Sequence, residues 1–135
     1  KLRHLKKWNG QRRDIAHRYN TLFAGAAGGM ILPHEPDWSR SVYHLYVLRV
    51  DDRAQLQKRL DEAGIGTGIH YPIALHLTKA YEGLGFHAGD FPVAEKAVLQ
   101  VLSLPMFPDL TSRQQDRVAT EVLKSLAVAS RSGSR

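Results

Sequence analysis

The fold of this chain is decided around Gly64–Pro72, which reads GIGTGIHYP. Proline disfavours helical geometry in the residue before it, so the sequence predicts a short extended segment that enters a stiff turn. The rings of His70 and Tyr71 should project from this turn. An imidazole and a phenol placed in this way can hydrogen-bond phosphates or sugar hydroxyls, and they can equally well bond nearby backbone.

The glycines of this stretch have the spacing G-x-G-x-G, which invites comparison with phosphate-binding loops. Those loops follow a strand and open a helix, whereas this one follows a helix predicted to lie between Asp52 and Ala63. We interpret Gly64 as the residue that ends this helix in the left-handed conformation, with Asp51 or Asp52 as its N-cap.

The segment Val42–Val50 (VYHLYVLRV) precedes that helix. It is β-branched, aromatic and apolar almost throughout, and such a pattern is typical of a strand covered on both faces. His44 lies within it, and we expect a buried histidine that bonds its neighbours and has a structural role.

The first part of the chain has apolar residues at spacings of three and four from Leu2 to Leu22, which predicts an amphipathic helix. Gly10 should weaken its middle by about 1 kcal/mol relative to alanine. Three glycines are expected to end it: Gly25, Gly28 and Gly29. No N-cap residue precedes Leu2, and we therefore expect the chain to begin inside an element of a longer protein.

The region after the turn is predicted to hold three further elements. The first is a helix over Ala74–Glu82. The second is a helix entered through Pro92 and capped by Asp90, whose buried side should carry Val93, Ala94, Ala97, Val98 and Val101. The third is a short strand over Leu102–Leu104.

Thr111 and Gln114 have the form of a capping box, which predicts the start of the final helix. Its inward residues should be Val118, Val122, Leu123 and Leu126. The order of elements predicts an α/β (α+β) domain over residues 1–128, with a small, mostly antiparallel sheet flanked by helices. Small polar residues at 129–135 predict a flexible tail.

Positive charge is concentrated at the two ends of the 135-residue chain, whose formal net charge is +6. Residues 1–18 carry seven Lys and Arg against one Asp, residues 19–110 carry seven against ten acids, and residues 111–135 carry five against two. Nucleic-acid-binding domains gather basic residues on one face or stripe, whereas a missing acidic neighbour would leave this imbalance. We therefore expect no nucleic-acid partner.

Several chemistries are disfavoured by composition. The chain has no cysteine, which excludes disulfides and thiolate catalysis. None of its seven histidines pairs with another at helical spacing, so we expect no metal. A G-x-S-x-G nucleophile turn and a P-loop are both lacking. No apolar run approaches about 18 residues, so we expect no membrane span and a cytoplasmic location.

Several blocks in a fixed order carry a resemblance to a known family. They are GIGTGIHYP at 64–72, LHL at 75–77, AY at 80–81, DFPVAE at 90–95 and LSLPM at 102–106. With the opening helix and the strand at 43–46, they make residues 1–127 resemble the C-terminal end of DegT/DnrJ/StrS-type nucleotide-sugar aminotransferases. This resemblance implies the small C-terminal domain of a fold-type-I enzyme that uses pyridoxal phosphate (PLP).

The family resemblance also implies a function for a longer protein. Such enzymes move an amino group, commonly from glutamate, onto the keto carbon of a nucleotide-linked sugar, and they act as homodimers. The lysine that binds PLP lies in their large N-terminal domain. None of Lys58, Lys79, Lys96 and Lys124 matches its motif, so we expect no catalytic and no cofactor-binding residue here.

By the same resemblance, His70 and Tyr71 match a His-Tyr turn at the rim where the nucleotide sugar binds. His76 matches a nearby recurrent histidine. We therefore predict these three as substrate-binding residues, and no metal ligands.

Three alternatives stay open. Some relatives replace the lysine by histidine and dehydrate the sugar instead, and this chain does not separate the two reactions. A domain of this fold could also serve dimerisation or regulation without catalysis. An unrelated basic α/β binding domain is the third possibility.

Overall fold

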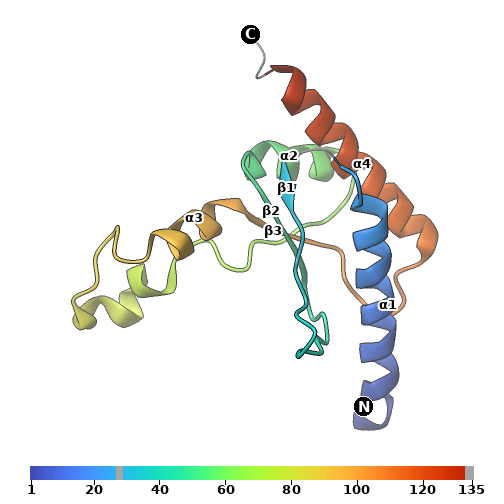
Figure 1. The fold of residues 1–135 in the computed structure, drawn as a ribbon, viewed down its shortest axis with the longest axis horizontal. Helices are drawn as coiled ribbons and strands as arrows, with labels where there is room; N and C mark the ends of the chain where they lie inside the picture. The colour runs from blue at the N-terminus through green and yellow to red at the C-terminus, as the bar shows by residue number, and fades with distance from the viewer. Residues whose placement is uncertain (27–28, 133–135) are drawn as a thin grey trace.

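A three-stranded antiparallel sheet lies at the centre of the molecule. The computed structural model describes residues 1–26 and 29–132. The sheet has the order β1 (Met30–Ile31), β2 (Tyr46–Val50), β3 (Val101–Leu104), and helices flank it (Figure 1). The predicted fold class is confirmed. The strand predicted over 42–50 is shorter than expected because only its second half pairs with β3.

The hydrophobic core lies between the sheet and three helices: α1 (Leu5–Phe23), α2 (Arg53–Glu62) and α4 (Ser112–Ser132). Alternate residues of β2 point into it, namely Tyr46, Leu48 and Val50. The Tyr19 ring of α1 lies 4.9 Å from that of Tyr46, between ring centroids. The Tyr46 hydroxyl donates to Asn20 Oδ1 at 2.7 Å, so the buried phenol has a partner.

Local signals place the helices of the core. The Asp52 side chain accepts a hydrogen bond from the Gln55 backbone N–H at 3.1 Å, and Gly64 ends α2 with φ of +69°. Thr111 and Gln114 form the predicted capping box, in which each side chain bonds the backbone N–H of the other. These predictions are confirmed.

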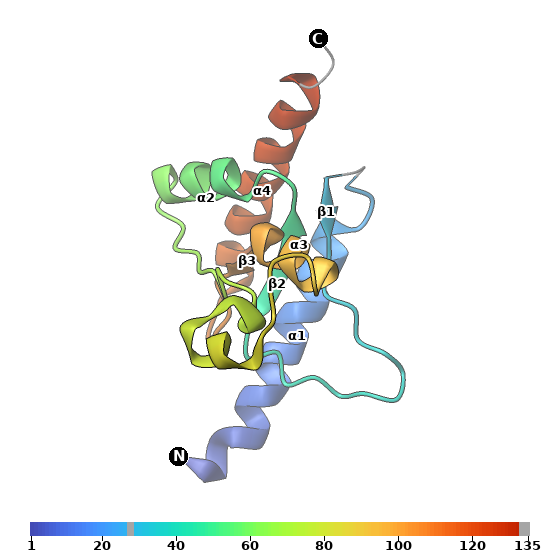
Figure 2. The ribbon, with the colours of Figure 1, turned by 90° about the vertical axis from the view of Figure 1, so that its left-hand side faces the viewer.

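Residues 71–100, which we call the arm, extend away from the core (Figures 1 and 2). The arm contains two 3-10 segments, η2 (Leu75–Leu77) and η3 (Lys79–Leu84), followed by α3 (Pro92–Gln100). The single helix predicted over Ala74–Glu82 is therefore replaced by two short 3-10 helices. Thr78, which has extended backbone and donates its hydroxyl to the Leu75 carbonyl, separates the two 3-10 segments.

For α3, the predicted cap is wrong and the predicted buried side is only partly covered. Asp90 does not cap the helix, because its carboxylate accepts from the His87 N–H at 2.7 Å. Glu95, in the first turn, instead reaches back to the N–H groups of Gly89 and Phe91. On the predicted buried side, Val93 (76% exposed) and Ala94 are open to solvent, whereas Ala97, Val98 and Val101 are partly buried, because the end of α3 reaches the sheet.

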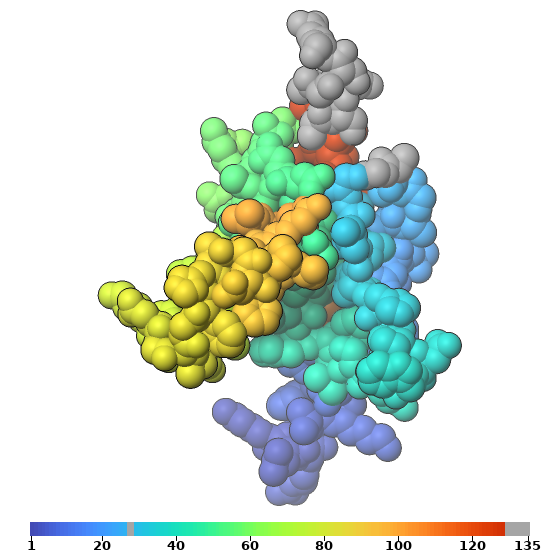
Figure 3. Space-filling view, turned by 60° about the vertical axis from the view of Figure 1, so that its left-hand side comes forward, coloured from blue at the N-terminus to red at the C-terminus, as the bar shows by residue number. Residues whose placement is uncertain are grey.

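The loop between β1 and β2 is fixed to α1 by Glu35. Its carboxylate accepts from the Arg13 guanidinium at 2.6 Å, from the Ser41 N–H at 2.6 Å and from the Tyr43 hydroxyl at 3.3 Å. The Arg13 hydrogen bond, followed by that of Ser41, lowers the pKa of Glu35 to about 2. Figure 3 shows this loop (cyan) standing out on the side of the molecule away from the arm (yellow).

The loop also overturns the prediction for His44. Tyr43 has a positive φ of +45°, and His44 follows it in a bend outside β2, with an exposed side chain. The expected buried strand histidine is therefore wrong, because the chain turns here before the sheet pairing begins.

The ends of the helices complete the fold. A 3-10 turn, η1 (Leu2–His4), leads into α1, which ends before Gly25 at φ +81°; Gly28 lies outside the described residues. The helix α4 runs to Ser132, beyond the start of the tail predicted at 129, and 133–135 lie outside the described residues. Within the described residues, no helix is long and apolar enough to cross a membrane.

Candidate functional site

The stretch that opens with Gly64 lies alongside β3, as an extended segment. The Gly68 N–H donates to the Ser103 carbonyl at 3.1 Å, and the Ser103 N–H donates to the Gly68 carbonyl at 2.7 Å. This isolated antiparallel bridge continues the sheet beyond β3. The chain then turns away at His70 and Tyr71, which are joined by a cis peptide bond. The extended segment and the turn were predicted, whereas the cis bond was not.

His70 is exposed but anchored on one side. Its Nδ1 lies 2.9 Å from Ser103 Oγ, and its ring lies directly over Gly68. A Cβ added to Gly68 would be 2.6 Å from His70 Cε1, closer than side-chain atoms approach one another. The ring therefore occupies the space that a side chain at position 68 would fill.

Tyr71 stands beside His70 and faces outward. Its side chain is 74% exposed, and the two ring centroids are 5.8 Å apart in a T-shaped arrangement. Tyr71 borders an open hollow of about 540 Å³, whose other lining residues are mainly apolar: Pro72, Ile73, Leu75, Thr78 and Val98. The pair thus presents one imidazole, one phenol and an apolar floor to an incoming ligand.

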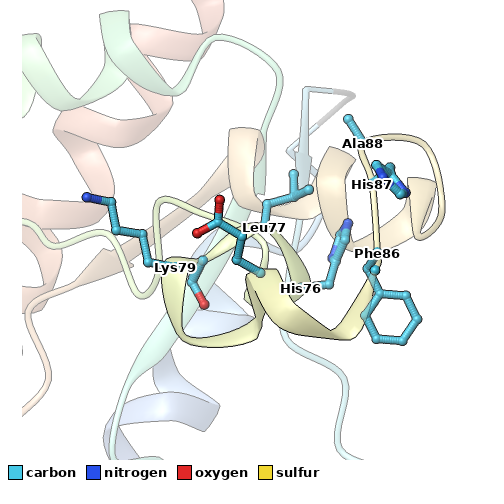
Figure 4. A pocket seen from close by; sticks show the side chains of 9 residues that line it. His76, Leu77, Lys79, Phe86, His87 and Ala88 are labelled. Atoms are coloured by element: carbon cyan, nitrogen blue, oxygen red, sulfur yellow. The ribbon is translucent and has the colours of Figure 1, made fainter.

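His76 lies in a different setting. Its side chain is only 8% exposed, and its Nε2 lies 3.1 Å from Glu95 Oε1. The ring packs against Phe91 at a centroid distance of 4.7 Å. His76 lines a hollow of about 490 Å³ together with Lys79, Phe86 and His87, whose side chains Figure 4 shows.

Glu95 organises this part of the arm. Hydrogen bonds from the Gly89 N–H, then from Phe91 N–H and His76, lower the pKa of its carboxyl below the usual 4.5. A carboxylate with these donors holds the loop before α3 against the helix. His76 is one of the groups that hold it, in addition to any ligand contact.

The three predicted substrate-binding residues therefore fall into two places. His70 and Tyr71 adjoin at the turn, while His76 lines a hollow within the arm. Sequence reasoning missed Ser103, the buried partner of His70. A signal was present, because Ser103 is a lone polar residue within the apolar strand Leu102–Leu104.

The residues of this chain do not fit a PLP site. All the lysines of this chain have exposed side chains, including Lys79 at the hollow beside His76, whereas a lysine that binds the cofactor is enclosed by its site. Four lie in core helices, with exposed side chains: Lys6 and Lys7 in α1, Lys58 in α2 and Lys124 in α4. Among the described residues, no group of three or more His, Cys, Asp or Glu side chains could hold a metal ion.

The fold and the turn together define a small α/β domain that presents a His-Tyr pair beside its sheet. The model of the DegT/DnrJ/EryC1/StrS aminotransferase family matches residues 1–123. The chain belongs to this family.

Individual relatives agree with this family. The erythromycin biosynthesis sensory transduction protein EryC1 of Saccharopolyspora erythraea is 45% identical, over 87% of this chain and 32% of its own length. The dTDP-3-amino-3,4,6-trideoxy-alpha-D-glucose transaminase of Streptomyces venezuelae is 40% identical, over 90% of this chain and 32% of its own.

A crystal structure of S. venezuelae DesV, in complex with a ketimine intermediate, is also similar. It superposes with a TM-score of 0.86 at 40% identity, over 91% of this chain and 33% of that chain. This chain therefore spans about a third of the length of the proteins it matches.

Proposed function

We propose that this chain is the C-terminal third of a PLP-dependent aminotransferase that acts on a nucleotide-linked keto sugar. The supporting observation is the similarity to an S. venezuelae structure, at 40% identity and a TM-score of 0.86. A relative from the same organism, which is also 40% identical to this chain, is named dTDP-3-amino-3,4,6-trideoxy-alpha-D-glucose transaminase. Glutamate as amino donor, a homodimer and a cytoplasmic location complete the proposal.

In this proposal the chain contributes to substrate binding rather than to the transfer itself. His70 and Tyr71 contact the nucleotide sugar at the rim of the active site, the imidazole through an exposed ring and the phenol above an apolar hollow. PLP supplies the electron sink in such enzymes, and it is held by the remaining two thirds of the protein, because every lysine here is exposed.

The exposed apolar side chains of the arm support the same proposal. Leu75, Leu84 and Val93 are 66%, 62% and 76% exposed, and exposed apolar side chains gathered in one region can form an interaction site. In the longer protein, the remaining two thirds of the chain would cover this surface. His76, which lies under it, is proposed to contact the ligand at the covered edge.

A regulatory role is the second candidate. It is favoured by one observation, the description of the Saccharopolyspora erythraea relative as a sensory transduction protein. The dehydratase reaction is a variant of the first proposal, and it would differ in the residue that takes the place of the lysine outside this chain.

The first experiment compares this chain with its full-length parent. The 135-residue chain should give no visible absorption of a lysine-bound PLP. The parent should give it, and should transfer nitrogen from labelled glutamate to a dTDP-linked keto sugar. Turnover by the 135-residue chain alone would contradict the proposal that PLP is held by the rest of the protein. PLP binding without nitrogen transfer by the parent would favour regulation or dehydration.

The second experiment tests the turn in the parent. Changing His70 or Tyr71 to Ala should raise the KM for the nucleotide sugar about ten- to a hundredfold, since a hydrogen bond to a charged group is worth about 1.5–3 kcal/mol. PLP affinity should not change. The matched control is His4→Ala, which alters an exposed histidine of η1 that borders neither hollow. Equal losses of PLP and nucleotide-sugar binding would remove His70 and Tyr71 from the rim.

A further inference from the structure

Ser103 holds the ring of His70 from the inside of the molecule. The serine is only 4% exposed. Its backbone pairs with Val47 of β2 on one side and with Gly68 on the other. Its Oγ therefore has a fixed position, 2.9 Å from His70 Nδ1. A side chain anchored between two paired segments can orient an exposed ring that would otherwise rotate freely.

The direction of this hydrogen bond follows from burial. Among the described residues, His70 Nδ1 is the only hydrogen-bond partner of the Ser103 hydroxyl. A buried hydroxyl whose hydrogen lacks an acceptor loses about 1–3 kcal/mol. The hydroxyl therefore donates to Nδ1, and the ring hydrogen resides on Nε2. Within the described residues, Nε2 has no hydrogen-bond partner.

Gly68 is the second part of the arrangement. A Cβ at this position would lie 2.6 Å from His70 Cε1 and 3.3 Å from Nδ1. The φ of Gly68 is not in the left-handed region, so an added methyl group would displace the ring rather than strain the backbone. Gly66, two residues earlier, has open space where its Cβ would be, and also lacks a positive φ.

We infer that Ser103 is a positioning residue that, with Gly68, fixes His70 as the Nε2–H form, with Nε2 offered to an oxygen atom of the ligand. Such a donor suits a diphosphate oxygen or a sugar oxygen of a nucleotide sugar. The ligand rests on the proposed function, whereas the ring orientation and its hydrogen do not. The two parts can therefore fail separately.

Nuclear magnetic resonance of the 135-residue chain tests the ring. At alkaline pH, where imidazoles are neutral, two-bond proton–nitrogen correlations distinguish a protonated from a bare ring nitrogen, and His70→Gln assigns the signal. We expect a protonated Nε2 and a bare Nδ1. Ser103→Ala and Gly68→Ala should shift both nitrogens towards averaged values, while Ser103→Thr and Gly66→Ala should leave them unchanged.

A hydrogen on Nδ1 in the unaltered chain would overturn the inference. The inference would also be overturned if the ring nitrogen signals stayed the same in both Ser103→Ala and Gly68→Ala. If Ser103→Ala prevents folding, Gly68→Ala still tests the ring, because it leaves the serine in place.

Kinetics of the full-length parent separate this inference from the proposed function. Ser103→Ala and Gly68→Ala should raise the KM for the nucleotide sugar about two- to tenfold, the effect of one misplaced hydrogen bond. Values of kcat should change less, and Gly66→Ala should change neither. If His70→Ala raises KM but Ser103→Ala and Gly68→Ala do not, the positioning role is wrong and the proposed function stands. If His70→Ala also leaves KM unchanged, His70 does not contact the ligand. Ser103 then cannot act on ligand binding through His70.

Discussion

The core and the arm are built from similar sequence but bury very different amounts of it. In the core, Leu48, Leu60 and Val122 have no exposed surface. In the arm, Leu75, Leu84 and Val93 are each more than half exposed. Apolar spacing is helical in both α3 and α4, yet α4 packs along α1 and α2, whereas α3 meets the sheet at β2. An apolar pattern therefore predicts a face, while the neighbouring elements determine whether that face is covered.

The two regions also differ in what their carboxylates join. Glu35 connects the loop before β2 to Arg13 of α1, 22 residues away in sequence. Glu95 binds Gly89, Phe91 and His76, which all belong to the arm. The core is thus tied together over long sequence distances, whereas the arm is held mainly by its own residues. We expect the arm to open at a lower free energy than the core.

The largest expected effect is that of a cavity in the core. Leu48→Ala should lower the free energy of unfolding by about 2–5 kcal/mol, because the side chain is fully buried. Leu84→Ala in the arm, where the side chain is 62% exposed, should change it by less than about 0.5 kcal/mol. Urea denaturation followed by circular dichroism measures both. Equal losses would mean that the arm packs as a second core.

The next effect depends on pH. The folded pKa of Glu35, about 2, lies below its ordinary value of 4.5. Its contribution to stability is therefore fully present above pH 4.5 and is lost as the pH falls from 4.5 towards 2. Glu35→Gln should lower stability at neutral pH and flatten the profile of unfolding free energy in this window.

Glu95→Gln is the matched test in the arm. The pKa of Glu95 is also lowered, but its partners lie within the arm. We expect faster hydrogen exchange of the amides of Gly89 and Phe91, with an unchanged urea midpoint for the core. A core midpoint that falls as much as in Glu35→Gln would show that the two regions unfold together.

A smaller effect concerns helix capping. Thr111→Ala removes the acceptor for the Gln114 N–H, and should cost about 1 kcal/mol. Asp90→Ala should cost the core almost nothing, since Asp90 bonds His87 rather than the start of α3. The midpoints of urea denaturation give both values. A cost at Asp90 equal to that at Thr111 would mean that the start of α3 contributes to the stability of the core.

Sequence alone predicted the parts of the fold that depend on near neighbours. The Asp52 cap, the left-handed Gly64 and the capping box at Thr111 each involve residues within three or four positions. The start of β2 was missed because Tyr43 adopts its positive φ within a network centred on Glu35. No periodicity of the segment itself contains that information.

The candidate site shows the same division. The proline at position 72 identified the turn that carries His70 and Tyr71. The partner of His70 was not predicted, because Ser103 lies 33 residues further along the chain. A lone serine in an apolar strand indicates a polar partner, and only the pairing of Gly68 with Ser103 shows which one it is.

The smallest expected effect concerns two glycines, one in the core and one in the arm, that both have open space around them. Gly10 lies within α1 of the core and Gly83 within η3 of the arm, and an added Cβ meets no atom within 4 Å at either. Gly10→Ala should raise the free energy of unfolding by about 0.5–1 kcal/mol, because alanine loses less backbone entropy in a helix. Gly83→Ala should leave the core midpoint unchanged, because order gained within the arm does not reach the core. A gain at Gly83 equal to that at Gly10 would mean that the arm and the core fold as one unit, despite the exposed apolar side chains of the arm.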